Sequence, residues 1–456
     1  MNNENPTNST KPPFYAQWAN VPFAPARWPF FYGWTIVGVS TLSIIGSIPG
    51  QTAGVGVFTD YIMEALDITR GRLSVAYLIG TVISGLILPF AGKLLDRIGV
   101  RLMSVFASLG LGISLILLAT ISRWTHWLGG FISLSLLPVV TVSFTFLMIR
   151  FFGQGNMTMV GRVAMGKWFN HWRGTATAIA GVPIAFVFNA APWIMNTLIK
   201  QYGWQQTCWI LAAIIGGGMS VIGILFFRDT PEECGLLMDG KKPADFDKKA
   251  KPDLHPVYRQ FTRGQAARTI SFWAFALGLA AHGLILTAVA FHITSIGQEM
   301  GKTTDQAVKM FLYSSFLSIP TRFIVSYFVD NTRLPLRWIL SLMAVTMGLY
   351  TFGLTVFDTR SGWLLTTVMF GMTGGIWGVL GNVPLPRYFG RDHLGAISGM
   401  MMSILVIASA LGPAMFSYGQ QRLGSYHATA YVMLVLPAII LVLSLLIRNP
   451  QRKYAP

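Results

Sequence analysis

The chain has 456 residues, of which 53% are hydrophobic and only 11% are charged, and its formal net charge is +17. Soluble globular chains carry about 25% charged residues, so this composition excludes intrinsic disorder and argues against a soluble multidomain enzyme. A strongly basic soluble protein would suggest nucleic acid, so the position of the cations along the chain decides what the charge means.

Apolar segments of about 20 residues, long enough to cross a bilayer, recur along the whole chain. The fourth is ambiguous, because the apolar run 127–165 is too long for one crossing and too short for two. Its helix begins early, begins late, or is long and tilted. The pattern predicts an all-α membrane protein with twelve transmembrane helices in two six-helix bundles, at residues 33–59, 73–92, 102–121, 130–152, 174–198, 207–227, 270–296, 308–329, 336–357, 363–385, 394–418 and 428–447.

Hydrophilic segments divide these spans. Residues 1–30 are polar and proline-rich and lack the pattern of a signal peptide, so we expect a retained cytoplasmic tail. The first bundle then covers residues 31–227 and the second covers 269–448, with a short tail at 449–456. Between the bundles lies a basic cytoplasmic loop, residues 228–268, which contains Lys241, Lys242, Lys248, Lys249 and Lys251.

The cations predict the orientation in the membrane. With the N-terminus inside and twelve crossings, the inner side holds three times as many Lys and Arg residues as the outer side. This excess is what the positive-inside rule expects of a multi-pass protein of the cytoplasmic membrane with both termini inside. Two arginines, Arg150 and Arg322, remain within apolar sequence.

Two segments in the two halves resemble each other. Residues 168–174 read WFNHWRG and residues 388–395 read YFGRDHLG, and each precedes a small-residue helix that contains a proline, Pro183 or Pro413. Such an echo is typical of parallel repeats, with a binding site between the halves near the membrane midplane.

Residues 92–101, with the sequence GKLLDRIGVR, lie between the second and third spans. They resemble the signature loop of the major facilitator superfamily at Gly, Leu, Asp, Arg, Gly and Arg. The resemblance covers nearly the whole chain. It implies a secondary transporter whose two halves rock about a central site.

Within that superfamily the chain resembles the monocarboxylate porters and their oxalate/formate relatives. The similar segments are residues 168–176, residues 228–236, and Arg322 followed by Asp330-Asn331. The chain departs from the porters at Ser318, where they carry a proton-coupling aspartate, and at residues 49–52, where they carry a lysine. It also lacks the span-11 lysine of the oxalate/formate branch. No acidic residue lies well inside a span, with Asp60 and Asp330 only at edges.

The signature loop contains a candidate conformational latch, formed by Gly92, Asp96, Arg97 and Arg101. Asp96 lies close to the start of the third span, where it can face helix N-terminal dipoles. The arginines can pair with it or with carbonyls of neighbouring helices. The alternative is ordinary inside-positive loop charge. Asp330 and Arg333 are the possible counterpart in the second half.

Arg322 is the leading substrate-binding candidate. A charge near the bilayer centre costs about 2.5–3.5 kcal/mol, so it usually faces a water-filled cavity or a partner. A guanidinium binds carboxylates bidentately, and the porter resemblance implies that role here. The alternative is packing against helix-end carbonyls. Arg150 either faces the same cavity, which would favour an anion, or extends to the cytoplasmic face.

Uncharged residues complete the candidate site. Asn189, Gln51 and Thr52 are possible cavity donors, although interhelical hydrogen bonding is the alternative for each. Trp377 lies in the glycine-rich tenth span as a possible cavity wall or a packing residue. His282 and His292 in the seventh span are proton-coupling candidates, because histidine titrates near neutral pH; packing is again the alternative.

The leading hypothesis is a secondary active transporter of a small organic anion, expected to be a monocarboxylate, working by proton symport or anion exchange as a monomer. If Arg150 also faces the cavity, a dicarboxylate becomes possible. A transporter of a neutral or drug-like solute is the alternative, and a membrane-bound sensor is a third. No catalytic set, metal motif or nucleotide loop is visible, and Cys208 and Cys234 predict neither a disulfide nor zinc. We therefore expect no enzyme activity, no cofactor and no nucleic-acid partner.

Overall fold

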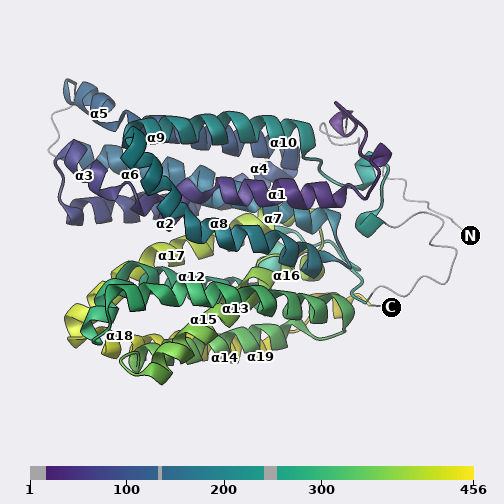
Figure 1. Cartoon of the computed structure of the whole chain (residues 1–456). Helices are drawn as coiled ribbons and strands as arrows, with labels where there is room; N and C mark the ends of the chain where they lie inside the picture. Colours follow the sequence, from purple (N-terminus) through teal and green to yellow (C-terminus); the bar gives the residue numbers. More distant parts are fainter. Residues whose placement is uncertain (1–16, 132–135, 241–253, 456) are drawn as a thin grey trace, which may run out of the picture.

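The computed structural model describes residues 17–131, 136–240 and 254–455. All long elements of this part are helices, and they form two halves that lie side by side, coloured purple to teal and green to yellow (Figure 1). The described N-terminal and C-terminal segments lie at the same end, which we call the inner end; the opposite end is the outer end. The expected basic lysines at 241–251 and most of the N-terminal tail lie outside the described residues.

The first half contains six crossings. The first is interrupted at Pro49 and Gly50, and the second and third belong to one bent element. A short helix, α5 (Ile121–Gly129), lies at the outer end. The crossings are α1 (Gly33–Gly46) with η3 (Ile48–Gly50), α2 (Thr52–Gly56) and α3 (Thr59–Leu66); α4 (Arg70–Ala119); α6 (Leu137–Ile149) with η4 (Arg150–Met157) and α7 (Thr158–Trp168); α8 (Arg173–Tyr202); and α9 (Trp204–Leu211) with η5 (Ala212–Met219) and α10 (Ser220–Phe226).

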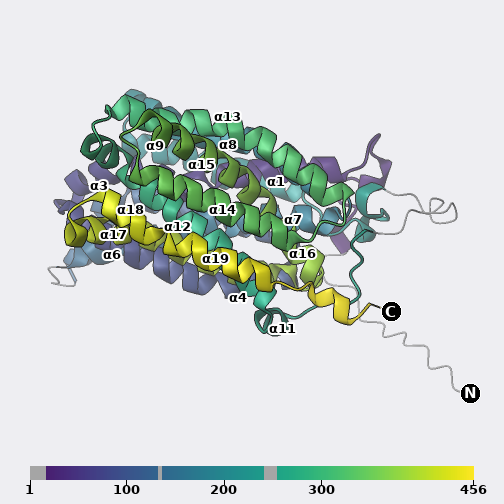
Figure 2. The ribbon, with the colours of Figure 1, turned by 90° about the horizontal axis from the view of Figure 1, so that it is seen from below.

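The second half also contains six crossings, and it lies nearest the viewer in Figure 2. A short helix, α11 (Arg263–Ala267), precedes it, and η9 (Pro450–Lys453) follows it. Its crossings are α12 (Ile270–Glu299), α13 (Thr304–Asn331), α14 (Leu336–Thr355), α15 (Arg360–Leu380) with α16 (Pro384–Phe389), α17 (Leu394–Leu423), and α18 (Tyr426–Met433) with α19 (Val435–Leu446).

The helices confirm the expected membrane architecture. Nine helices in the described part are long and apolar enough to span a bilayer. One of them, α4, has 50 residues and supplies two crossings. The interrupted first crossing and α13 complete the twelve. Large apolar side chains remain exposed around the bundle, for example Trp193 at 71% and Phe90 at 66%. Such a surface fits a protein that is solvated by lipid.

Gly99 divides the second crossing from the third. Its φ of 81° lies in the left-handed region, which a side chain disfavours. A Cβ at this position would also lie 2.5 Å from the Asp229 carboxylate. The glycine of the signature loop is therefore required both for the bend and for the close approach of Asp229.

The fourth crossing begins late. The expected span 130–152 is wrong at its inner edge, because the helix continues through η4 and α7 to Trp168. The π-helical η4 contains Arg150, Gly153 and Gln154, and such wide turns often occur at functional sites. This register places Arg150 near the middle of the crossing and brings Arg162 inside it.

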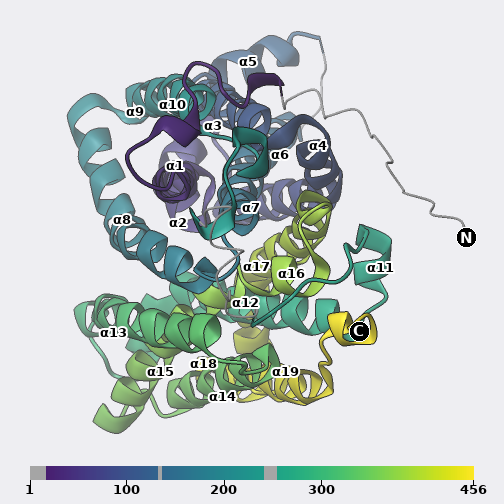
Figure 3. The same ribbon diagram turned by 90° about the vertical axis from the view of Figure 1, so that its right-hand side faces the viewer.

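The two halves meet along two pairs of helices. α4 packs against α17, and α8 packs against α13; Figure 3, seen from the inner end, shows both pairs at the boundary between the halves. The α4–α17 contact is close because Gly92 and Gly399 face each other. Asp96 lies on a helix of the first pair, and Asp330 and Arg322 lie on a helix of the second.

Candidate functional site

Two carboxylates join the halves at the inner end. Asp96, on α4, accepts hydrogen bonds from the backbone amides of Gly395 and Ala396, both at 2.7 Å. Asp330, on α13, accepts from the amides of Gly174 at 2.8 Å and Thr175 at 2.7 Å. Each carboxylate therefore caps the N-terminus of a helix in the opposite half, where the free amides and the helix dipole favour an anion.

Glycine makes both caps possible. A Cβ on Gly395 would lie 2.5 Å from Asp96 Oδ1, and a Cβ on Gly174 would lie 2.7 Å from Asp330 Oδ1. These glycines occupy the equivalent places of the two repeated segments. The Asp96 cap differs from expectation in one respect: it faces the N-terminus of α17, in the other half, and not that of the third crossing.

Asp229 caps the third crossing instead. Its Oδ1 accepts a hydrogen bond from the Val100 amide, and the residue is 5% exposed. Burial raises the pKa of the Asp229 carboxyl, and the charge of Lys167 and the amide of Val100 oppose that rise. Asp229, which follows the sixth crossing, thus supports the signature loop from within the same half.

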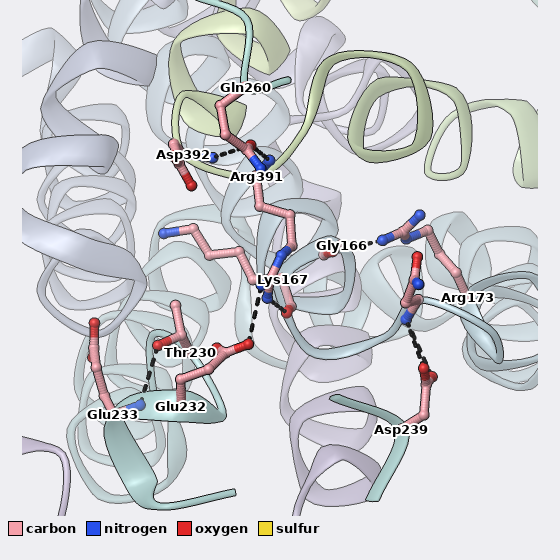
Figure 4. A network of polar contacts seen from close by, with 11 residues as sticks. Gly166, Lys167, Arg173, Thr230, Glu232, Glu233, Asp239, Gln260, Arg391 and Asp392 are labelled. Carbon is pink, nitrogen blue, oxygen red and sulfur yellow. Dashed lines mark hydrogen bonds and ion pairs between the residues drawn. The ribbon is translucent and has the colours of Figure 1, made fainter. Parts of the chain in front are cut away.

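A polar network surrounds this region at the inner end (Figure 4). Arg391 donates to the Lys167 carbonyl at 2.8 Å and forms an ion pair with Glu232 at 3.0 Å, which joins the halves again. Lys167 is buried, and its charge acts on the carboxyls of Asp96, Asp229 and Glu233. Burial and the neighbouring Asp229 raise the pKa of Glu233 to about 7, against the opposing effect of Lys167.

The arginines of the signature loop lie apart from the Asp96 cap. Arg101 donates to the carbonyls of Ile224 at 2.6 Å, Trp18 at 2.7 Å and Val21 at 2.7 Å, so it fastens the N-terminal segment. Arg97 is exposed. Of the four expected latch residues, Gly92 and Asp96 therefore contact the opposite half. Arg101 instead pairs with carbonyls of neighbouring segments, which was the second possibility expected for the arginines of this loop.

Arg322 lies between two glycines at the boundary of the halves. A Cβ on Gly181 of α8 would be 1.5 Å from its Nη1, and a Cβ on Gly378 of α15 would be 2.5 Å from its Nη2. Its Nε is buried without a hydrogen-bond partner. Throughout the described residues no acid pairs with Arg322 and no carbonyl accepts from it. The packing alternative, in which helix-end carbonyls satisfy the guanidinium, therefore has no support in these contacts.

Arg162 is a cation that sequence reasoning missed, because the early placement of the fourth span assigned it to a loop. It lies on α7, half-buried, with its guanidinium 5.1 Å from the centre of the Trp377 ring. Its Nη1 is 3.8 Å from the sulfur of Met402, a weak acceptor. A Cβ on Gly381 would lie 3.2 Å from the same nitrogen. The apolar run that continues to Met165 is the sequence signal from which its position inside the membrane could have been predicted.

Arg150 has a different environment. It is fully buried, and it donates to the Gly50 carbonyl at 3.0 Å, at the break in the first crossing. Weaker contacts at 3.4 Å reach Thr52 Oγ1 and Ser409 Oγ. Gly50 and Gly153 approach closely enough that a Cβ on either would lie within 2.8 Å of the other's backbone. Arg150 therefore connects the broken helix to η4 and reaches α17.

The uncharged candidates all have protein partners. Gln51 donates to Ser47 Oγ at 2.9 Å, Asn189 donates to Ser315 Oγ across the boundary at 2.5 Å, and Trp377 Nε1 donates to the Leu279 carbonyl at 3.2 Å. Trp377 also contacts a central arginine, because the Arg162 guanidinium lies over its ring. It joins the arginine site, whereas Gln51 belongs to the break in the first crossing.

The two histidines have unlike surroundings. His292 is bonded at both ring nitrogens, to the Pro413 carbonyl at 3.0 Å and to the Tyr426 hydroxyl at 3.2 Å. His282 is 2% exposed and lies among the rings of Tyr350, Phe370 and Trp377. His292 thus packs among fixed partners, and His282 lies next to the wall of the arginine site.

Metal chemistry has no visible ligand set in the described part of the chain, where no group of three His, Cys, Asp or Glu residues could hold an ion. Cys208 and Cys234 are both free and buried.

The sequence and the fold were both compared with those of known proteins. Residues 40–413 match the sequence profile of the Major Facilitator Superfamily, whereas no curated protein matches the chain significantly in sequence. Similar solved structures include the E. coli fucose:proton symporter FucP, with 12% identity over 93% of this chain and 98% of that chain and a TM-score of 0.60. The proton:xylose symporter XylE has 14% identity, 90% and 94% coverage and a TM-score of 0.60.

The human organic anion transporter MFSD10 is similar to the same degree, with 14% identity, 90% and 98% coverage and a TM-score of 0.59. At such identities the likeness to these structures shows the fold alone. The profile match, in contrast, extends over most of the crossings and includes the signature loop with its Asp96 cap. The chain therefore belongs to the major facilitator superfamily and is a multi-pass membrane transporter.

Proposed function

We propose that the protein transports a small organic anion and binds a carboxylate of that anion at Arg322. The observation that carries this proposal is the environment of Arg322, whose guanidinium lies between Gly181 and Gly378 without a hydrogen-bond partner or counter-charge in the described residues. A carboxylate matches the planar donor geometry of a guanidinium and neutralises its charge.

The energetics support a ligand at this place. A charge inside a membrane protein is costly unless it is paired or hydrated, and an unpaired buried charge is costlier than a paired one. The two glycines give the guanidinium access to the boundary but give it no acceptor. An anion would supply acceptors that the protein does not provide to the Arg322 guanidinium, so affinity for anions follows from its lack of protein partners.

The carboxylate caps suggest how the binding site opens alternately to the inner and the outer side of the membrane. In this conformation Asp96 and Asp330 hold the inner ends of the halves together. Breaking both caps would free α17 and α8 to move with their own halves. We assign the inner end to the cytoplasm of a cytoplasmic membrane, on the basis of its cation excess, and we expect a monomer to be sufficient because the site lies within one chain.

The resemblance to the monocarboxylate and oxalate/formate porters supports this proposal only in part. Arg322 and the cap at Asp330 follow their pattern, whereas Ser318 replaces the coupling acid. Within the described residues, the Ser318 hydroxyl donates to the Ser315 carbonyl of its own helix and to no other group. Proton symport would therefore need another titratable group, for which His282, whose ring lies 5.9 Å from that of Trp377, is the candidate beside the site. Anion exchange needs no such group.

The test is uptake into proteoliposomes that contain the purified full-length protein, with a panel of carboxylates and their uncharged amides, each with and without a pH gradient. We expect saturable uptake of carboxylates and none of the amides. Arg322→Gln should abolish uptake, whereas Arg360→Gln, which removes an exposed arginine from the outer end of α15, should leave it unchanged. Equal uptake of acid and amide would favour the neutral-solute alternative.

A further inference from the structure

A second arginine faces the same surface as Arg322 from the other half. Arg322 belongs to α13 and touches Gly378, and Arg162 belongs to α7 and touches Gly381 and the Trp377 ring. Gly378 lies in the last turn of α15 and Gly381 is the C-cap of the same helix, three residues further on, which is about one helical turn or ~5 Å. The two guanidiniums therefore lie near consecutive turns of one helix, with Trp377 beside them.

The charges of this pair are not balanced within the protein. The Arg322 guanidinium is close enough to repel that of Arg162. Among the described residues, neither forms an ion pair, and the only acceptor of Arg162 is the sulfur of Met402 at 3.8 Å. Two like charges that share a half-buried site without an acid disfavour each other and the protein interior.

Arg150 does not explain the second charge. Its guanidinium is fully buried, and it already donates to the Gly50 carbonyl and contacts Thr52 and Ser409. The face of the Tyr77 ring, 5.3 Å from its guanidinium carbon, covers it further. Arg162, in contrast, lacks a strong acceptor and remains half-buried. The second cation available to a substrate is therefore Arg162.

We propose that the transported anion carries two acidic groups, one bound by Arg322 and the other by Arg162, with Trp377 packing against the carbon chain between them. This inference rests on the proposed function and makes it narrower: the substrate class is a short dicarboxylate, and Arg162 is a specificity-determining residue. Because the arginines belong to different halves, such a substrate joins the halves at their boundary and cancels the repulsion between the two cations.

In an alternating-access mechanism, the number of charges on the substrate affects how easily the site between Arg162 and Arg322 closes. An anion with a single charge would leave one guanidinium unpaired when the site closes. A dianion would leave neither. The cost of closing is thus lowest for the substrate with two acidic groups, so the discrimination should be visible in both binding and transport.

The experiment compares each diacid with its own monoamide, because the two molecules differ by one charge at nearly equal size. Purified full-length protein in detergent is titrated at pH 7.5 with malonate, succinate, glutarate and adipate, and with malonamate, succinamate, glutaramate and adipamate. Ligand-induced thermal stabilisation and competition report affinity. We expect the best diacid to bind at least about tenfold more tightly than its monoamide, as one charge-assisted pair implies.

Variants then assign the preference to Arg162. In Arg162→Gln the diacid should lose its advantage while the monoamide still binds within a few-fold of its wild-type affinity, and Arg162→Lys should restore part of the preference. Arg322→Gln should lose both ligands, and Arg360→Gln should behave as the wild type. Size-exclusion profiles and melting curves without ligand verify that the variants are folded.

Two results would overturn the inference and leave the proposed function intact: a wild-type protein that binds monoamide and diacid equally, or an Arg162→Gln variant that keeps the full preference. A wild-type protein that binds no carboxylate at any length, but responds to inorganic phosphate or to neutral solutes, would overturn both the inference and the proposed function. The two failures are thus distinguishable in one titration series.

Discussion

Asp96 and Asp330 occupy equivalent places in the two halves, and each carboxylate accepts hydrogen bonds from the backbone amides of the second and third residues of a helix in the opposite half. The relationship is reciprocal: α4 caps α17, and α13 caps α8. Asp330 gains one further bond, from the Thr175 hydroxyl at 2.7 Å. The inner end is therefore closed by two matched contacts that must break together if the halves are to separate there.

Removing the charge of either carboxylate should favour opening of the inner end. Asp96→Asn and Asp330→Asn keep an acceptor but lose the interaction with the helix dipole, which contributes about 0.3–1 kcal/mol. Each variant should shift the equilibrium about two- to fivefold, and the double variant should shift it further. Spin labels at the exposed positions Lys93 and Arg333, one in each half, report the separation of the inner ends.

The matched control for this prediction is Asp358→Asn, which removes an exposed carboxylate at the outer end. Cys208 and Cys234 are buried, so they interfere little with labelling. Distance distributions that remain the same in the double variant and in the control would contradict a latch at Asp96 and Asp330.

Gly181→Ala should displace Arg322 without unfolding the protein. The added Cβ would lie 1.5 Å from Nη1, the flexible end of a side chain, so the guanidinium must move while the backbone keeps its place. We expect carboxylate affinity to fall at least about tenfold, because the loss of one charge-assisted contact has this effect. Titration of the variant with the best carboxylate measures it.

Gly38→Ala is the control for this substitution, since a Cβ at Gly38 meets nothing within 4 Å. Melting curves separate displacement from unfolding: the two variants should melt at similar temperatures. Unchanged affinity in Gly181→Ala would show that the position of the Arg322 guanidinium does not matter for binding.

Glu233 should make the stability of the inner end depend on pH. Burial raises the pKa of this carboxyl to about 7, so the folded protein holds the proton more tightly than the unfolded chain does. Stability that is present at pH 5 should therefore decrease as the pH rises toward 7. Glu233→Gln should flatten that dependence, and Glu64→Gln, at an exposed outer position, should not.

Melting temperatures of the detergent-purified variants between pH 5 and 8 measure this effect. Because Lys167 and Asp229 act on the same carboxyl, the slope and not the absolute value is the diagnostic quantity. A Glu233→Gln variant with the slope of the wild type would assign the pH dependence to other groups.

The uncompensated pair of Arg162 and Arg322 also predicts exchange of one anion for another. An empty site must close around two like charges, whereas a loaded site closes around a neutral complex. Efflux of a loaded anion from proteoliposomes should thus be at least about tenfold faster with the same anion outside than with none, on the scale of one unpaired charge.

His282 and His292 serve as the test of the alternative, in which a histidine couples transport to protons. In His292 both ring nitrogens already have partners, and His282 is enclosed by aromatic rings. His282→Gln and His292→Gln should therefore keep exchange unchanged. Efflux that needs a pH gradient, and loses that need in His282→Gln, would assign coupling to His282 instead.

The fold could be predicted from sequence to a large extent, because lipid requires long apolar helices and leaves few alternatives. The uncertain element was the fourth crossing. Hydropathy alone does not distinguish a helix at 130–152 from one that ends at Trp168, since most residues of the whole run are apolar. Packing decides: the contact of Gly153 with Gly50 and the wide turn of η4 set the register.

The candidate site was predictable only where a single residue is exceptional. Arg322 stands out because it interrupts an apolar span, whereas Arg162 was hidden by the wrong register of the fourth crossing. The partner of Asp96 was also beyond local sequence, since Gly395 is almost 300 positions away and only the association of the halves brings them together. The sequence shows which charged residues are costly to place within a membrane, whereas only tertiary packing shows which groups they face.

Equilibrium binding of one carboxylate to the wild type and to Arg322→Gln and Arg322→Lys tests the central claim most directly. The account predicts that Arg322→Gln weakens binding about 100-fold or more, since a bidentate charge-assisted contact is lost. Arg322→Lys should bind with intermediate affinity, because it retains the charge but not the planar fork. Equal affinity of the wild type and Arg322→Gln for the same carboxylate would contradict the assignment of the substrate site to Arg322.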